Sequence, residues 1–155
     1  MMNATRTHTW IRTLCLLGAL SLAGGVLPAA DQPATTGVTE KMAAKTKQLI
    51  VWTSGDREVA LKMVFMYAYN CKKRGWMDEV RLLVWGPSGK LLTEDKELQD
   101  NLKGLKDEGV ELYACKGCAD MYGISDKLTA LGINVMYTGT LLADAQKDGW
   151  HVLTF

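Results

Sequence analysis

Two neighbouring cysteines, Cys115 and Cys118, are the clearest chemical signal in this chain of 155 residues. They flank Lys116 and Gly117 in a Cys-x-x-Cys motif that directly follows the segment 110–114, in which Glu111 is the only charged residue. That segment predicts a strand, and the residues after the motif predict a helix. Open α/β proteins hold ligands and reactive groups where parallel strands end, so the motif predicts thiol chemistry at such a position.

The start of the predicted helix is expected to stabilise a thiolate or persulfide anion. Its unpaired amides and the positive end of its dipole lie close to the two sulfurs, and Lys116 adds a positive charge. Gly117 lets the backbone turn closely between the sulfurs, and no acid is nearer in sequence than Asp120. We therefore expect a lowered thiol pKa at Cys115, at Cys118, or at both.

Thioredoxins also carry Cys-x-x-Cys, usually after their first strand, with an aromatic residue before the motif and a cis-proline opposite. Here the motif follows the third predicted strand, Ala114 precedes it, and no proline occurs after Pro87. Thioredoxin itself is therefore disfavoured, while an inert pair or a disulfide that merely staples the turn stays open. Cys71, on an earlier predicted helix, is interpreted as a core residue.

Residues 1–30 have the layout of a secretory signal peptide, with two arginines, no acid, and then a long uncharged run rich in Leu and Ala. Cleavage is expected after Ala30, with a competing small-residue site at 23–25. No lipid anchor is predicted at Cys15. We expect export to the periplasm without stable membrane insertion after cleavage, and an uncleaved anchor is the alternative.

Removal of residues 1–30 leaves three cysteines and a single histidine, His151. A zinc site with four cysteine ligands is then impossible within one chain, so no metal or other cofactor is predicted. The formal net charge of +1 provides no basic field for nucleic acid. With 48% hydrophobic and 23% charged residues, the composition is that of an ordinary globular chain with room for one substantial core.

The segment 31–47, rich in Ala, Thr and Lys, is interpreted as a flexible linker, and 48–155 as one α/β domain. Short apolar runs alternate with helical stretches, which predicts about five mostly parallel strands, and right-handed crossovers make a three-layer α/β/α sandwich the expected architecture. The predicted strands are 49–52, 80–85, 110–114, 133–137 and 150–155. The predicted helices are 57–73, one from about Glu94 to a stop at Gly109, one containing 119–122 and starting near Cys118, 125–131 capped by Ser125, and 141–147.

The predicted helix 57–73 is apolar around its whole circumference, since Lys62 is the only charged residue between Val59 and Tyr69. Such a helix is expected to be buried on all sides. In a domain of this size the sheet covers one side only, so the other side is expected to pack on a neighbouring subunit. The alternative is that later helices or the linker fold over it.

Four segments of the chain together resemble the DsrE/DsrF-like family of the YchN type: 49–56, 83–88, 110–115 followed by Gly123-Ile124, and 149–155. The resemblance extends from Leu49 to Phe155 and implies an α/β sandwich that assembles as a trimer or hexamer. In sulfur-relay members, a single cysteine at the end of this strand, with a glycine eight residues on, carries sulfur as a persulfide. Cys115 and Gly123 match that spacing, and Cys118 is an additional thiol.

Two turns at neighbouring strand ends are expected to border the same crevice as Cys115. Ser54 and Gly55 lie in the first turn, and the adjacent Arg57 is expected either to pair with an anionic sulfur species or to be solvated at the helix start. The segment 86–90 is interpreted as a second bordering loop. It is not interpreted as a phosphate loop, because it lacks residues which that motif requires.

These observations favour an exported sulfur-handling protein in which Cys115 carries sulfur and Cys118 is the resolving thiol. Its expected partners are sulfur donor and acceptor proteins or small sulfur species, and the activity would be that of a sulfurtransferase-type carrier. A thiol-disulfide oxidoreductase using the same pair is one alternative. A non-catalytic oligomeric protein that binds a small ligand is the other.

Overall fold

In the computed structural model, which describes residues 44–155, five apolar segments form one sheet in which every neighbouring pair of strands is parallel. The strand order is β4-β3-β2-β1-β5. The bounds are β1 (Lys47–Trp52), β2 (Glu79–Val84), β3 (Glu111–Cys115), β4 (Asn134–Met136) and β5 (His151–Thr154). The predicted fold class and strand number are confirmed. The predicted signal peptide, 1–30, lies outside the described residues.

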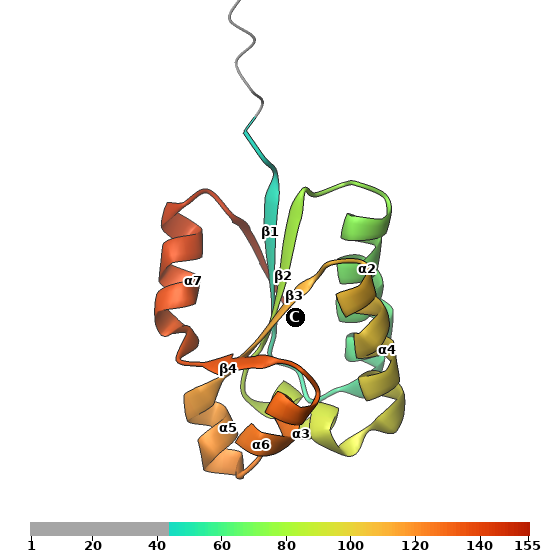
Figure 1. Ribbon diagram of the computed structural model, residues 1–155, viewed down its shortest axis with the longest axis vertical. Coiled ribbons are helices and arrows are strands. Elements are labelled where there is room, and N and C mark those ends of the chain that lie inside the picture. The colour runs from blue at the N-terminus through green and yellow to red at the C-terminus, as the bar shows by residue number, and fades with distance from the viewer. Residues whose placement is uncertain (1–43) are drawn as a thin grey trace, which may run out of the picture. The chain divides into compact units, whose positions relative to one another are not determined.

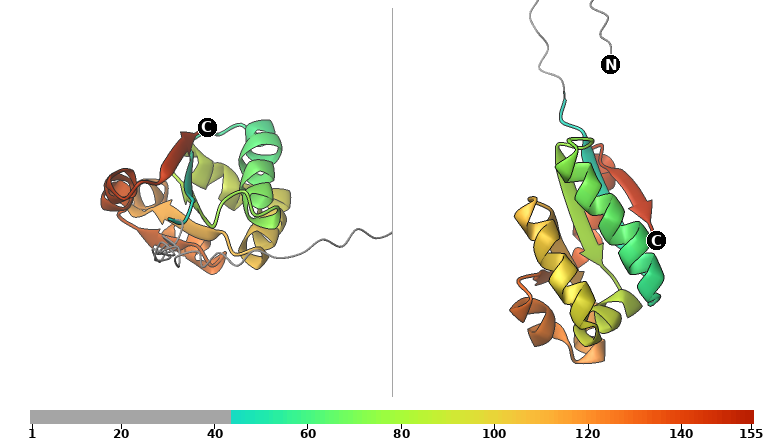
Figure 2. Two further views of the ribbon diagram at one scale, coloured as in Figure 1. Left: turned by 90° about the horizontal axis from the view of Figure 1, so that it is seen from above. Right: turned by 90° about the vertical axis from the view of Figure 1, so that its right-hand side faces the viewer.

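Helices cover both faces of this sheet, as the predicted three-layer sandwich requires (Figures 1 and 2). One face carries a continuous helical rod and, beside it, a second helix, whereas the opposite face carries α7 (Thr138–Lys147). The rod consists of α1 (Arg57–Val59), η1 (Ala60–Phe65) and α2 (Met66–Lys73), and its neighbour is α4 (Lys96–Asp107). Three short helices lie near the carboxyl ends of the strands: α3 (Pro87–Glu94), α5 (Lys116–Tyr122) and α6 (Ser125–Ala130).

The core is divided by the sheet into a large and a small cluster, because successive side chains of a strand point to opposite faces. Ile50 and Leu82 belong to the large cluster under the rod and α4, whereas Leu49 and Leu83 belong to the small cluster under α7. Arg81 closes the outer end of the small cluster, with its guanidinium 4.1 Å from the centre of the Trp150 ring. More apolar side chains are therefore buried between the sheet and the rod than between the sheet and α7.

The rod follows the extent predicted for a helix over 57–73, and Asp56 is its N-cap, accepting hydrogen bonds from Glu58 and Val59 amides at 2.7 and 3.1 Å. Its central part, η1, is a π-helix, which the sequence pattern did not predict. The prediction of burial on all sides is not met within one chain, since Met63 and Met66 are 48% and 57% exposed. The sheet covers the inner side of the rod only.

Three local predictions are wrong for identifiable reasons. The segment 86–90 is not a loop, because Gly86 turns the chain with a φ of 73° and Pro87 begins α3. The helix after the motif begins at Lys116 and not near Cys118, which places Cys115 in the N-cap position. Ser125 is the first residue of α6 and not its cap, because its hydroxyl donates to Asp120 Oδ1 at 2.7 Å.

Candidate functional site

Cys115 is the last residue of β3, at the edge of the sheet where the carboxyl ends of four strands meet. In the parallel register, Trp52 pairs with Val84, Val84 with Ala114, and Cys115 with Met136. The residues that follow β2 and β4, the two neighbours of β3, therefore lie beside the Cys-x-x-Cys turn. The topology brings two separate parts of the chain to the two thiols.

The sulfur of Cys115 is half-buried and lies in a polar environment. Burial opposes its ionisation, but hydrogen bonding from the Cys118 amide and the Thr138 hydroxyl outweighs burial and lowers the pKa of Cys115. The Cys118 thiol and the Gly117 amide act in the same direction. Cys115 is the N-cap residue of α5, and its side chain makes no capping hydrogen bond of ordinary geometry.

Cys118 lies one helical turn further on, and its environment has the opposite effect. Burial and the neighbouring Cys115 sulfur raise the pKa of the Cys118 thiol, although the Gly86 amide and the Trp85 side chain partly offset them. The described cysteines, which include Cys71 in the core, are all free thiols. The surroundings therefore favour the thiolate at Cys115 and the protonated thiol at Cys118.

Lys116 binds a carboxylate of its own helix. Its ammonium lies 2.6 Å from Asp120 Oδ2 and 5.9 Å from the centre of the Tyr137 ring. The negative charge of Asp120, the nearest acid in sequence, is thus balanced by the Lys116 ammonium on the same helix. The structure places this ion pair on the exposed side of α5, next to the thiols.

The first predicted turn lies close to the motif, but its arginine does not point toward it. A Cβ atom at Gly55 would lie 3.5 Å from Pro87, so this turn touches the start of α3 beside the Cys118 environment. Ser54 accepts a hydrogen bond from the Asp56 amide at 3.0 Å. Arg57 instead binds Asp95, with a distance of 2.7 Å between Nε and Oδ2, and also binds Glu97.

Gly123 lies at the far end of α5 from Cys115. Its φ of 65° and ψ of 33° end the helix in the left-handed region, and the following Ile124 amide donates to the Ala119 carbonyl at 2.9 Å. The spacing of eight residues between Cys115 and Gly123 therefore corresponds to the length of one short helix. This gives the glycine a structural role in ending the element that carries Cys118.

Two residues that contact the thiols were not predicted from the sequence, namely Trp85 and Thr138. Trp85 directly follows β2, and Thr138 lies two residues after β4. Their place just after strands that neighbour β3 is the one sequence feature from which they could have been predicted. Within residues 44–155 no cluster of three or more His, Cys, Asp or Glu residues is arranged to hold a metal ion. Over the same residues, no helix combines the length and apolar character needed to cross a membrane.

Comparison with known families matches residues 47–155 to the model described as the DsrE/DsrF-like family. The chain belongs to the DsrE/DsrF-like family. The matched region comprises all five strands, so family membership extends over the whole described fold. A search of curated proteins finds no match.

Solved structures support the same fold for this DsrE/DsrF-like chain. A conserved protein of unknown function from Bacteroides thetaiotaomicron, BT1422, is 33% identical with a TM-score of 0.70, over 74% of this chain and 98% of its own. The ychN protein from E. coli is 19% identical with a TM-score of 0.56, over 71% of this chain and 100% of its own. MTH1491 from Methanobacterium thermoautotrophicum, also of unknown function, is 20% identical with a TM-score of 0.56, over 70% and 99%. The last two similarities concern the fold alone.

Proposed function

We propose that this DsrE/DsrF-like protein is an exported sulfur carrier that holds sulfane sulfur as a persulfide on Cys115. The observation that carries the proposal is the unequal environment of its two thiols. The pKa of Cys115 is lowered and that of Cys118 is raised, although they are three residues apart. A thiolate is the nucleophile in sulfur exchange, so the environment favours Cys115 as the acceptor.

The first step transfers one sulfur atom. The Cys115 thiolate attacks the outer, sulfane sulfur of a donor persulfide, the donor's S–S bond breaks, and the donor leaves as a thiolate. Cys115 then carries an S–S bond and the terminal sulfur that the donor held. Donor proteins or small sulfur species such as polysulfide can supply this atom.

Cys118 provides a second step. Once deprotonated, its sulfur attacks the inner sulfur of the Cys115 persulfide, a Cys115–Cys118 disulfide forms, and hydrosulfide leaves. The two cysteines are oxidised by two electrons, and the transferred sulfur is reduced to sulfide. Return to the starting state requires an external dithiol. Transfer to an acceptor thiol is the competing route, and it leaves Cys115 reduced.

Intact-mass analysis after treatment with polysulfide tests the assignment. The wild-type protein and Cys118→Ser are expected to gain the mass of a sulfur atom, and Cys115→Ser is expected to lose that gain. The adduct should last longer in Cys118→Ser, because the resolving thiol is missing. Retention of the gain in Cys115→Ser together with its loss in Cys118→Ser would contradict the proposal.

The same pair of thiols also supports a second function, that of a thiol-disulfide oxidoreductase. One readily ionised cysteine and one protonated cysteine, a helical turn apart, can exchange a disulfide without carrying sulfur. Titration against a glutathione redox series separates the two functions. A reversible two-electron couple with no sulfur adduct after polysulfide treatment would favour the oxidoreductase.

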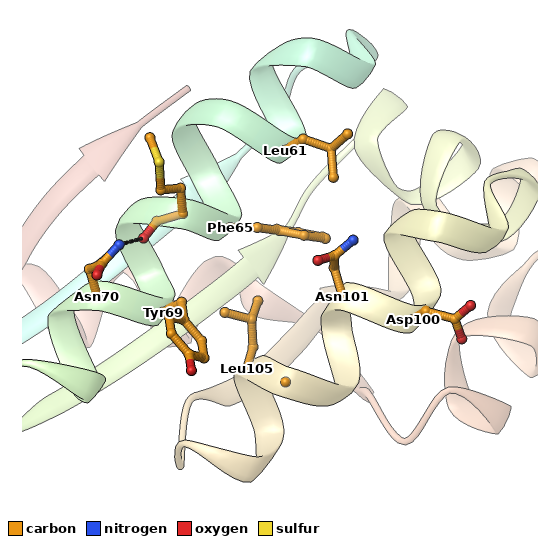
Figure 3. A pocket seen from close by; sticks show the side chains of 9 residues that line it. Leu61, Phe65, Tyr69, Asn70, Asp100, Asn101 and Leu105 are labelled. Atoms are coloured by element: carbon orange, nitrogen blue, oxygen red, sulfur yellow. Dashed lines mark hydrogen bonds between the residues drawn. The ribbon is translucent and has the colours of Figure 1, made fainter.

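We also propose that the protein acts as a homo-oligomer, either a trimer or a hexamer. The support is the outer side of the rod, where Met63 and Met66 are exposed and Met66 lines a groove of about 470 Å³ between the rod and α4. Leu61, Phe65 and Leu105 line this groove from both helices (Figure 3). A second copy would cover apolar surface that one chain leaves in water.

A further inference from the structure

Thr138 is one of three polar residues that are buried in the described part of the chain, together with Gln48 and Ser88. The other two are accounted for by backbone partners. The Gln48 amide donates to the His151 carbonyl at 3.0 Å, and the Ser88 hydroxyl donates to the Trp52 carbonyl at 2.6 Å. Thr138, which is 3% exposed, instead lies beside the Cys115 sulfur, where its hydroxyl helps to lower the pKa of Cys115 against the effect of burial.

The strand register and the start of α7 bring Cys115 and Thr138 together. Cys115 pairs with Met136 in the parallel register, and Thr138 follows two residues later as the first residue of α7. Along β3, Tyr113 packs into the small cluster under α7, and alternation puts Cys115 on that same side. The start of the helix that covers this face therefore meets the last side chain of β3.

Few titratable groups compete for the Cys115 sulfur. On α5 they are Cys118, whose pKa is raised by burial and by the neighbouring Cys115 sulfur, and the Lys116–Asp120 ion pair, whose charges neutralise each other. Tyr137, at the N-cap of α7, is 68% exposed. The neighbouring end of β2 contributes the uncharged Trp85. A neutral hydroxyl can therefore decide how the sulfur is held.

We propose that Thr138 is a positioning residue for Cys115: its buried hydroxyl donates to the thiolate and makes Cys115, rather than Cys118, the reactive thiol. This inference rests on the proposed function only where it explains which sulfur receives the transferred atom. The effect of the Thr138 hydroxyl on the reactivity of Cys115 can be measured whether or not the protein carries sulfur. Thr138 does not exchange sulfur itself.

The test is the pH dependence of iodoacetamide alkylation, followed separately at Cys115 and Cys118 by peptide mass analysis of the full chain. Thr138→Val keeps the shape of the side chain and removes the hydroxyl. We expect it to move the Cys115 midpoint to higher pH and to slow alkylation at pH 7 by about threefold to tenfold. Thr138→Ser restores the hydroxyl and should restore the wild-type profile. Thr140→Val, at an exposed position of the same helix, is the matched control.

Two results would overturn the inference. One is a Cys115 profile in folded Thr138→Val that matches wild type, and the other is a Thr138→Ser profile as shifted as that of Thr138→Val. If Thr138→Val does not fold, Thr138→Ser is compared with wild type. A Cys115 midpoint that moves to higher pH in Thr138→Ser would contradict the inference, because the hydroxyl is still present in that variant. A polysulfide mass assay run in parallel separates the two proposals. Absence of an adduct in Cys118→Ser, which lacks the resolving thiol, contradicts the sulfur carrier alone, whereas an unchanged alkylation profile contradicts the role of Thr138 alone.

Discussion

Cys115 is the N-cap of a seven-residue helix that contains Cys118, yet the surroundings shift the pKa values of the two thiols in opposite directions. The pKa of Cys115 is lowered by the first amides of α5 and by a hydroxyl from α7, although burial opposes them. Cys118 faces the end of β2, where burial and the neighbouring sulfur outweigh the Gly86 amide and the Trp85 side chain. The asymmetry arises from side chains outside the motif, so the same four residues in another fold need not divide their roles in this way.

The pH dependence of thiol reactivity follows from this asymmetry. The lowered pKa means that Cys115 stays ionised below the pH at which an ordinary thiol becomes protonated, and its alkylation rate falls only as pH drops through that lowered value. Cys118, with a raised pKa, should still gain rate at higher pH after Cys115 has reached its plateau. Rates measured at each cysteine between pH 5 and about 10 check this. Coincident midpoints would contradict it.

Gly123 is predicted to act through the backbone. Gly123→Ala forces a side chain into the left-handed region and should lower the free energy of unfolding by about 1 kcal/mol. Gly104→Ala is the matched control, since Gly104 lies inside α4, where an alanine should stabilise by about 0.5 kcal/mol. Denaturant unfolding measures both. A loss of Cys115 reactivity in Gly123→Ala without loss of stability would instead place the glycine in the reactive site.

At the scale of elements, the site is built from the ends of parallel strands and from the short helices that follow them. Helix α3 is a clear example. Its Ser88 hydroxyl donates to the Trp52 carbonyl at 2.6 Å and accepts from the Trp85 amide at 3.0 Å, which joins the ends of β1 and β2. The backbone that faces Cys118 is held in place by a residue that never touches a thiol.

Ser88→Ala is therefore expected to affect both stability and the site. It removes both hydrogen bonds of the hydroxyl, whereas the Trp52 carbonyl and the Trp85 amide keep their bond to each other at 2.9 Å, so the free energy of unfolding should fall by about 1 kcal/mol. Thr93→Ala removes a hydroxyl that bonds within its own helix, to the Lys90 carbonyl at 3.0 Å, and should cost about 0.5 kcal/mol or less. Thermal and denaturant unfolding provide the comparison. Equal losses in the two variants would show that Ser88 does not join the strands.

At the scale of the whole described fold, the two helical layers have separate tasks. The layer with α7 lies beside the thiols, because its first residue reaches Cys115. The layer with the rod and α4 lies on the opposite face of the sheet (Figure 2). Two methionines of the rod, Met63 and Met66, are exposed there. Assembly through the second layer would leave the thiols open to donors and acceptors.

The double variant Met63→Glu, Met66→Glu is expected to convert the proposed oligomer into monomers, because it places charges on surface that a second copy would bury. Light scattering coupled to size-exclusion chromatography measures the mass. Met121→Glu is the matched control, since this methionine is 88% exposed on α5, at the other site. Assembly that survives the double variant but fails with Met121→Glu would move the interface to the thiol side.

Much of this protein could be predicted from its sequence. Five apolar runs separated by helical stretches predicted the parallel sheet, because periodicity and length are properties of a local segment. The Cys-x-x-Cys turn at the end of a strand was predicted for the same reason. The helix at α3 was missed because the Gly-Pro pair that opens it is also typical of loops.

Only the tertiary structure decided what surrounds the sulfurs. Thr138 and Trp85 reach the site because strands far apart in sequence lie side by side, and no local pattern encodes that neighbourhood. The same holds for Arg57, whose long side chain binds Asp95. Sequence determined which residues could do sulfur chemistry, through their types and local spacing. The fold decided which of the two thiols has the lowered pKa, because hydrogen bonds to a sulfur depend on groups brought together in three dimensions.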